Sequence, residues 1–454
     1  MNFEQLLATT IFLVAYGLMA LQVMDKTRIA LAGGALMLVL RLVDQHTAFH
    51  GTEAVPGIDW NTIFLLVGMM IIVGVTSHTG LFQWMGIKAA KIVRGHPLGV
   101  AISLSLVTAV ASALLDNVTT VLLIAPIALV VTGQLGVDPV PYLVAIILAS
   151  NIGGTATLIG DPPNIMIASA AGFGFMDFIK YDTPAVLMVL VAFSVALWVG
   201  LGPRIRVPLE RRLRILALDE REAIRAPALL RKCLFVFGLT LVGFVIHSYV
   251  HLEPATIALA GASLLLVLLG RHPRVPGEEE NADFHWYHLV EWKTIFFFIG
   301  VFIMVACLVD LGVIEALGRS LMAFTGGNIV TLTLLTLWFS AVASGIIGSI
   351  PFVATMNALI LTIDPAGIHG LRESAITGAG HHPAIFPLWW ALSLGACLGA
   401  NFTVIGAAAN VVVAEISADA GHPIDFFRFM KYGVPITLMS LVICTVYLWV
   451  LFLR

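Results

Sequence analysis

Four short polar segments interrupt the apolar runs of this 454-residue sequence and hold the side chains best suited to bind a solute. They lie at residues 116–120, 150–164, 344–355 and 395–410. Their glycines and prolines cannot all continue a helix, so we expect helices to break there. A broken helix leaves backbone N–H and C=O groups unpaired, and Asn and Thr side chains add donors and acceptors beside them. The segments therefore predict a site for a small, hydroxylated or partly hydrated solute.

Asp116 and Asp161 are the only carboxylates within these segments. A carboxylate at membrane depth is costly and is easily held protonated, so we expect these two to carry a proton. The alternative is that each one only caps a helix by accepting backbone N–H bonds. No Lys or Arg lies within the four segments, which favours a neutral, monoanionic or cationic substrate over a dicarboxylate or citrate.

Cys397 opens the last segment, and its thiol would bind trivalent arsenic. The alternative is that it is a small buried residue that lets helices pack closely. The four cysteines show no spacing typical of a metal site or a disulfide framework. We therefore expect no metal and no cofactor.

The elements that position these segments must lie in a membrane. Of all residues 59% are hydrophobic and 11% are charged, whereas soluble domains carry about 25% charged residues. The length suits about ten membrane-spanning helices, so we expect an all-α polytopic membrane protein. The apolar stretch around residues 116–120 is long enough to enter the membrane, turn and leave on the same side. It predicts a re-entrant hairpin, with a second one around residues 344–355.

Basic residues predict the orientation of the chain. Residues 203–232 hold nine of the 24 Lys and Arg residues, so the positive-inside rule places this linker in the cytoplasm. The loop with Lys26 and Arg28 falls on the same side. We expect a multi-pass protein of the cell (inner) membrane, each half of which crosses the membrane an odd number of times.

The two halves also repeat one another. Residues 28–40 match 256–268, 60–64 match 292–296, 112–120 lie over 344–352, 151–164 over 397–410, and 178–188 over 429–439. Copies that each cross an odd number of times sit in opposite orientations, which is typical of inverted-repeat secondary transporters. The predicted domains are a first repeat (1–202), the cytoplasmic basic linker (203–232) and a second repeat (233–454).

The motifs DNVTT at 116–120, SNIGGTATLIGDPPNI at 150–165 and ACLGANFTVIGAAANVVV at 396–413 carry a resemblance to a known family. They resemble the ion transporter superfamily, and within it the ArsB/NhaD grouping of arsenite efflux permeases, sodium/proton antiporters and the melanosomal P protein. The resemblance implies an antiporter with paired re-entrant hairpins. It also implies a substrate site made of Asn117, Thr119, Thr120, Asn151, Thr155, Thr157 and Asn164 from the first half and Ser349, Asn401, Thr403 and Asn410 from the second. The hairpin tips depart from the Ser-Asn-Thr tips of related dicarboxylate carriers.

The leading hypothesis is proton-coupled efflux of arsenite or antimonite, with Asp116 exchanging the proton. A sodium/proton antiporter that uses Asp116 and Asp161, and a sodium- or proton-coupled anion or carboxylate carrier, stay open. An enzyme is not expected, because the sequence shows no nucleophile with its base and orienting group. The expected partners are a small inorganic solute, a coupling proton or sodium ion and the lipid bilayer, but no nucleic acid. A homodimer and a soluble ATPase subunit stay open.

Overall fold

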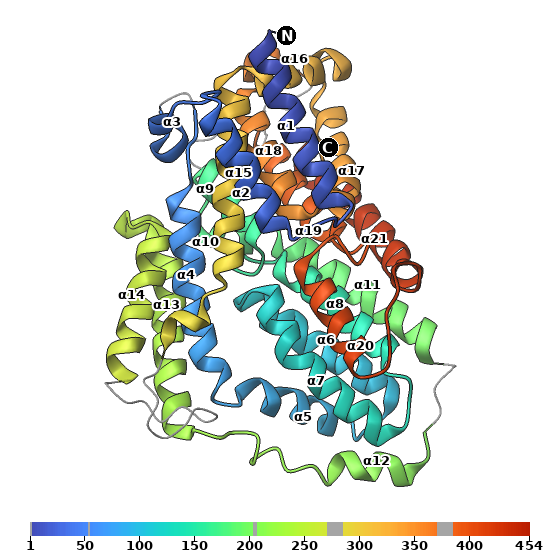
Figure 1. Ribbon diagram of the computed structural model, residues 1–454. Helices are drawn as coiled ribbons and strands as arrows, with labels where there is room; N and C mark the ends of the chain where they lie inside the picture. The colour runs from blue at the N-terminus through green and yellow to red at the C-terminus, as the bar shows by residue number, and fades with distance from the viewer. Residues whose placement is uncertain (1, 53–54, 203–206, 270–284, 370–384) are drawn as a thin grey trace.

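The computed structural model describes residues 2–52, 55–202, 207–269, 285–369 and 385–454 (Figure 1). Within these ranges the chain is helical and forms no strand, which confirms the all-α prediction. Nine helices of the described residues are long and apolar enough to cross a membrane, and four shorter apolar helices accompany them. Residues 203–206 of the linker lie outside the described ranges.

The described residues before the linker form eleven α-helices. They are α1 (Phe3–Ala20), α2 (Lys26–Val39), α3 (Gln45–His50), α4 (Trp60–Ser77), α5 (Leu81–Ile92), α6 (Pro97–Leu114), α7 (Asn117–Leu135), α8 (Val140–Gly154), α9 (Pro162–Ala171), α10 (Phe175–Tyr181) and α11 (Thr183–Leu201). Within the linker, α12 (Leu209–Leu216) is a short amphipathic helix.

The described residues after the linker form nine further α-helices. They are α13 (Pro227–Val250), α14 (Pro254–Leu269), α15 (Trp292–Asp310), α16 (Val313–Thr325), α17 (Ile329–Ile347), α18 (Ser349–Thr362), α19 (Phe386–Gly399), α20 (Ala408–Asp419) and α21 (Phe426–Leu448). Helix α13 begins inside the range 203–232 that the sequence assigns to the linker, because Pro227 suits the first turn of a helix.

Two helical hairpins lie where the sequence predicts them. The turn between α6 and α7 ends at Asp116, whose carboxylate caps α7 by accepting the backbone N–H of Thr119 at 2.7 Å. The turn between α17 and α18 is Gly348, with φ of +96°, a conformation that favours glycine. Figure 1 shows α7 in the lower part of the molecule and α18 in the upper part. Their re-entrant course in a membrane stays a prediction.

Several contacts between a helix of one half and a helix of the other half are repeated by the equivalent pair of helices. Helix α9 packs on α18, and its equivalent α20 packs on α7, the equivalent of α18. In the same way Gly68 of α4 lies against the backbone of Ala258 in α14, and Gly300 of α15 lies against the backbone of Ala30 in α2. Reciprocal contacts of this kind are the pattern that a twofold relation produces. The opposite orientation of the halves in a membrane, and the domain limits themselves, stay predictions.

The linker docks on the ends of helices from the first half. Arg225 donates its backbone N–H to Thr79 O at 3.0 Å, and Arg211 reaches the carbonyl groups at the end of α7. Glu220 pairs with Lys91 and, at 3.4 Å, with Lys88 on α5. The hydrogen bond from Lys91 is the main cause that lowers the pKa of Glu220 to about 2. The basic linker is therefore a docked strap between α5, α7 and α13.

Candidate substrate and proton site

The first break is the interruption between α8 and α9 in residues 150–164, and the second break is the interruption between α19 and α20 in residues 395–410. Equivalent hydrogen bonds hold the two breaks. Ser112 Oγ donates to Ser150 O at 2.7 Å, and its equivalent Ser344 Oγ donates to Ala396 O at 2.6 Å. After each break a threonine returns to the neighbouring hairpin, because Thr403 donates to Gly345 O at 2.6 Å and Thr157 donates to Ala113 O. The hydroxyl groups of both threonines are therefore used to close the break.

Two asparagines close the loops that follow the breaks. Asn164 donates both N–H bonds of its amide to backbone oxygens, Thr155 O at 3.1 Å and Thr157 O at 3.0 Å. The equivalent Asn410 donates to Ala400 O at 2.8 Å and Thr403 O at 2.9 Å. Because backbone oxygens only accept, each amide has one allowed orientation, and its Oδ1 points to a donor elsewhere.

A directed chain of amides joins the two halves. Asn151 donates to Asn410 Oδ1 and to Asn401 Oδ1, each at 2.8 Å. Asn151 Oδ1 accepts from Asn117 Nδ2 at 3.3 Å, and the same Nδ2 donates to Asp161 Oδ1 at 3.2 Å. All five side chains are buried. The chain starts at the backbone of the second break and ends on a carboxyl group of the first.

The two candidate carboxylates differ in their exposure and in their hydrogen bonds. Asp116 is half-buried and caps α7, and its role in carrying a proton stays a prediction. Asp161 is 2% exposed and begins α9 without capping it. Its Oδ2 is buried and has no hydrogen-bond partner among the described residues, although the Cys397 thiol lies beside the carboxyl group. Asp161 is therefore the carboxyl group with free capacity for a proton or a cation.

Other hydroxyl groups predicted to bind substrate are also paired within the protein. Thr120 Oγ1 donates to Asp116 O at 2.8 Å, and Thr155 Oγ1 donates to Asn151 O at 2.8 Å. Thr119 donates its backbone N–H to Asp116 Oδ1. Ser349, which also belongs to the predicted set, lines a cavity at the tip of the second hairpin.

That cavity has a volume of about 430 Å³ and is lined by the starts of three helices. The N-cap residues of α18 and α20 are Gly348 and Ala407, and neither helix has a side-chain cap. Lys26, the first residue of α2, is the one basic residue among the described lining residues, and its Nζ lies 5.2 Å from the centre of the Phe297 ring. The uncapped N–H groups and this cation favour an anion at the second break, whereas Asp25 and Glu415 on the same lining oppose one.

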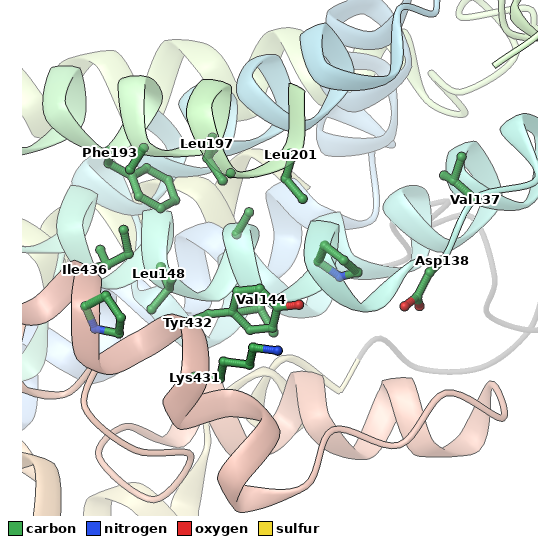
Figure 2. Close-up of a pocket in the computed structure, with 15 residues that line it drawn as sticks. Val137, Asp138, Val144, Leu148, Phe193, Leu197, Leu201, Lys431, Tyr432 and Ile436 are labelled. Atoms are coloured by element: carbon green, nitrogen blue, oxygen red, sulfur yellow. The ribbon is translucent and has the colours of Figure 1, made fainter. Parts of the chain in front are cut away.

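Another cavity, of about 630 Å³, lies between α8, α11 and α21 (Figure 2). Its described lining is apolar except for Asp138, Lys431 and Tyr432. It holds none of the residues predicted to bind substrate or a proton. Its lining does not match a small polar solute, so it is not the candidate site.

Three side chains near the breaks were not singled out from the sequence. Lys26 was placed only in a cytoplasmic loop, and nothing in the sequence connects it to the second break. Asp182 is fully buried and bonded to Ser393. A signal for Asp182 existed, because it is a carboxylate next to a long apolar run and the repeat aligns it with Gly433. No sequence signal distinguishes Ser393.

Comparison with known proteins places this arrangement among transporters. Residues 16–395 match the sequence profile of the family CitMHS, described as citrate transporter. An uncharacterised transporter of Mycobacterium tuberculosis is 46% identical over 442 residues, which cover 97% of each chain. The human P protein is 32% identical over 518 aligned residues, and the match covers 97% of this chain and 59% of the P protein.

A solved structure shares the fold. The YdaH transporter of Alcanivorax borkumensis superposes with a TM-score of 0.54 over 99% of this chain and 98% of its own, at 15% identity. This likeness concerns the fold alone. The ArsB/NhaD grouping within the superfamily stays a prediction.

Proposed function

The chain belongs to the CitMHS citrate transporter family and is a multi-pass membrane transporter, and we propose that it carries a carboxylate anion coupled to a proton. The observation that carries this proposal is the difference in charge between the two breaks. In the first half the hairpin tip and the break each hold one carboxylate, Asp116 and Asp161, whereas the equivalent positions of the second half are Gly348 and Ala407. A cavity with uncapped helix starts and a lysine, together with a proton site in the same molecule, suits a proton-coupled anion carrier.

The second break supports the anion half of the proposal. Its two uncapped helix starts and Lys26 surround one cavity that is large enough for a small carboxylate. Of the carboxylates on its lining, Asp25 is occupied in capping α2, and Glu415 is exposed on α20. The sequence shows no basic residue within a break, but the fold brings Lys26 to the second break from another segment. The sequence argument against a carboxylate substrate therefore loses its support.

The first break supports the coupling half. Asp161 accepts one hydrogen bond at Oδ1, and its Oδ2 has no hydrogen-bond partner in the described part of the chain. The amide chain through Asn117 and Asn151 connects Asp161 to the second break. A change in the charge of Asp161 therefore alters the hydrogen bonding of Asn410, which closes the loop beside the cavity that Lys26 lines. We propose that Asp161 exchanges the coupling proton and that Asp116 orients α7.

Efflux of arsenite or antimonite and sodium/proton exchange stay predictions for this chain. The arsenite hypothesis rested on a site without a basic residue, and Lys26 removes much of that support. The Cys397 thiol is fully buried and donates to Asn164 Oδ1 at 3.4 Å, so a metalloid would have to displace this contact.

The test is uptake of labelled citrate into proteoliposomes that hold the purified chain, with a proton gradient imposed. We expect Lys26→Met to weaken citrate binding by about 2 kcal/mol, or about 30-fold in Kd, because a charge-assisted hydrogen bond is lost. Lys180→Met is the matched control, since Lys180 also lies over a ring, that of Tyr181, but outside the cavity. Arsenite uptake without citrate uptake, or equal citrate binding by both variants, would overturn the proposal.

A further inference from the structure

A second buried carboxyl group, Asp182, lies near the first break and is not used by the proposed function. It joins α10 to α11 and is fully buried, and its Oδ2 lies 2.5 Å from Ser393 Oγ on α19. Its Oδ1 is also buried and has no hydrogen-bond partner within the described ranges. None of the ion pairs found in the described residues includes it.

Ser393 stands between two oxygens that both require a donor. Its Oγ lies 2.7 Å from Asn164 Oδ1 as well as beside Asp182 Oδ2. The orientation of the Asn164 amide is fixed, because its Nδ2 donates to two backbone oxygens. A hydroxyl group has one proton and cannot donate to both neighbours. Both contacts are hydrogen bonds only when Asp182 carries a proton and donates it to Ser393.

The charge on Asp182 thereby controls a hydrogen bond at the first break. When Asp182 is ionised, the Ser393 hydroxyl turns toward the carboxylate and leaves Asn164 Oδ1. Asn164 Oδ1 then keeps only the Cys397 thiol at 3.4 Å, which is a weak donor. Asn164 holds the loop after the break, so the effect reaches the backbone next to Asp161.

The groups around Asp182 do not compensate a negative charge. Cys397 of α19, Cys444 and Tyr447 of α21 and Tyr181 of α10 lie within electrostatic reach. Tyr447 Oη donates to Tyr181 O at 2.7 Å and is not directed at the carboxyl group. On the near side, Lys180 is exposed and lies over the Tyr181 ring, and Asp161 beyond Cys397 adds a second acidic group. A carboxylate in these surroundings is desolvated, and none of the described residues forms an ion pair with it.

We propose that Asp182 is a second proton-binding group of the transport cycle and that Ser393 transmits its protonation state to Asn164 at the first break. Proton binding forms one O–H bond on Oδ2, and release breaks that bond and returns the proton to water. The inference rests on the proposed function, because it adds a coupling group to the same carrier. It differs in its readout, since protonation of Asp182 is measured without any substrate.

The experiment is a pH titration of the full chain in lipid films, followed by infrared absorption of protonated carboxyl groups. We expect Asp182→Asn to lose one such band that the unmodified protein shows at neutral pH. Asp419→Asn, which changes an exposed carboxylate at the end of α20, should keep it. A spectrum of Asp182→Asn that equals the unmodified one at every pH overturns the proposal.

Ser393→Ala provides the second variant, which keeps Asp182 and removes its hydrogen-bond partner. We expect the band to persist and to shift to higher frequency, and an unshifted band contradicts the role of Ser393. This variant also serves if Asp182→Asn does not fold. In proteoliposomes Asp182→Asn should lose the response of citrate uptake to an imposed pH gradient. If the unmodified protein does not transport citrate but Asp182→Asn loses the band, the proposed substrate is refuted and the proton site is supported.

Discussion

Asn151→Ala is the substitution that tests the connection between the two halves most directly. Asn151 is fully buried at the end of α8 and makes three side-chain hydrogen bonds to other asparagines. It donates to Asn401 and Asn410 at 2.8 Å each and accepts from Asn117 at 3.3 Å. The substitution removes all three bonds and adds no clash.

The magnitude follows from the number of bonds. A hydrogen bond between helices in a membrane contributes about 0.6 kcal/mol on average, and a buried bond in a soluble protein about 1 kcal/mol. The loss of three bonds, with the Asn117 amide and two carbonyl oxygens left without this partner, gives a destabilisation of about 2 to 4 kcal/mol. We also expect transport to fail, because the chain from Asn410 to Asp161 is cut.

The assay is unfolding by titration with sodium dodecyl sulfate, which gives the change in the free energy of unfolding. A double-mutant cycle of Asn151→Ala with Asn410→Ala isolates the bond between these two side chains and should give a coupling of about 1 kcal/mol. Asn61→Ala is the matched control. Asn61 of α4 accepts one bond from the backbone N–H of Ala255 at 3.1 Å, so its loss should cost about 1 kcal/mol.

The reasoning is refuted if Asn151→Ala destabilises the protein no more than Asn61→Ala. It is also refuted if the cycle shows no coupling between Asn151 and Asn410.

Three further predictions concern packing, the breaks and the linker. Gly399→Val should lower the free energy of unfolding by about 1 to 3 kcal/mol, because its Cβ would overlap the backbone of Ala341 in α17. Thr403→Val should cost about 1 kcal/mol in the same assay, since it loses the bond that closes the second break. The third prediction follows from the lowered pKa of Glu220. The ion pair of Glu220 with Lys91 stabilises docking of the linker at a pH above 4.5, the ordinary pKa of a glutamate. This stabilisation is lost as the pH falls from 4.5 toward about 2. Glu220→Gln should therefore speed hydrogen exchange of residues 207–226 near neutral pH, and the difference from the unmodified chain should disappear in acid.

Each of these predictions has a control in the same chain. Gly200→Val on α11 introduces a side chain where nothing lies within 4 Å, so equal losses at both glycines would contradict the packing argument. Thr10→Val removes an exposed hydroxyl that bonds only its own helix and should be nearly neutral. Glu210→Gln changes an exposed linker carboxylate for which no ion pair is found among the described residues. Unchanged exchange in Glu220→Gln would show that the pair does not hold the linker.

Much of the fold could be predicted because its signals are local. Long apolar runs require helices, and glycine or proline ends them, so the two hairpins and the two breaks follow from composition and spacing. The repeat then paired these features, as at Thr157 with Thr403 and at Asn164 with Asn410. The sequence predicts a linker up to residue 232, because Arg231 and Lys232 continue the run of basic residues. Both residues belong to α13, which begins at Pro227.

The roles of individual side chains were less predictable, because they depend on what lies within hydrogen-bond distance. Asp116 and Asp161 both precede a helix, yet only Asp116 caps its helix. Several threonines that resembled substrate ligands are paired with backbone oxygens of neighbouring segments. Local sequence does not reveal which oxygen will lie nearby.

The sequence by itself therefore determined a helical membrane protein with four polar breaks in two related halves, because helix length, helix interruption and internal repetition are properties of neighbouring residues. Only the tertiary structure decided which groups meet. Lys26 reaches the tip of the second hairpin more than 300 residues later in the chain, and Ser393 reaches Asp182 across 211 positions. The physical reason is that a proton or an anion is bound by groups that converge in space, and packing of α2, α11, α18 and α19 brings those groups together from distant parts of the chain.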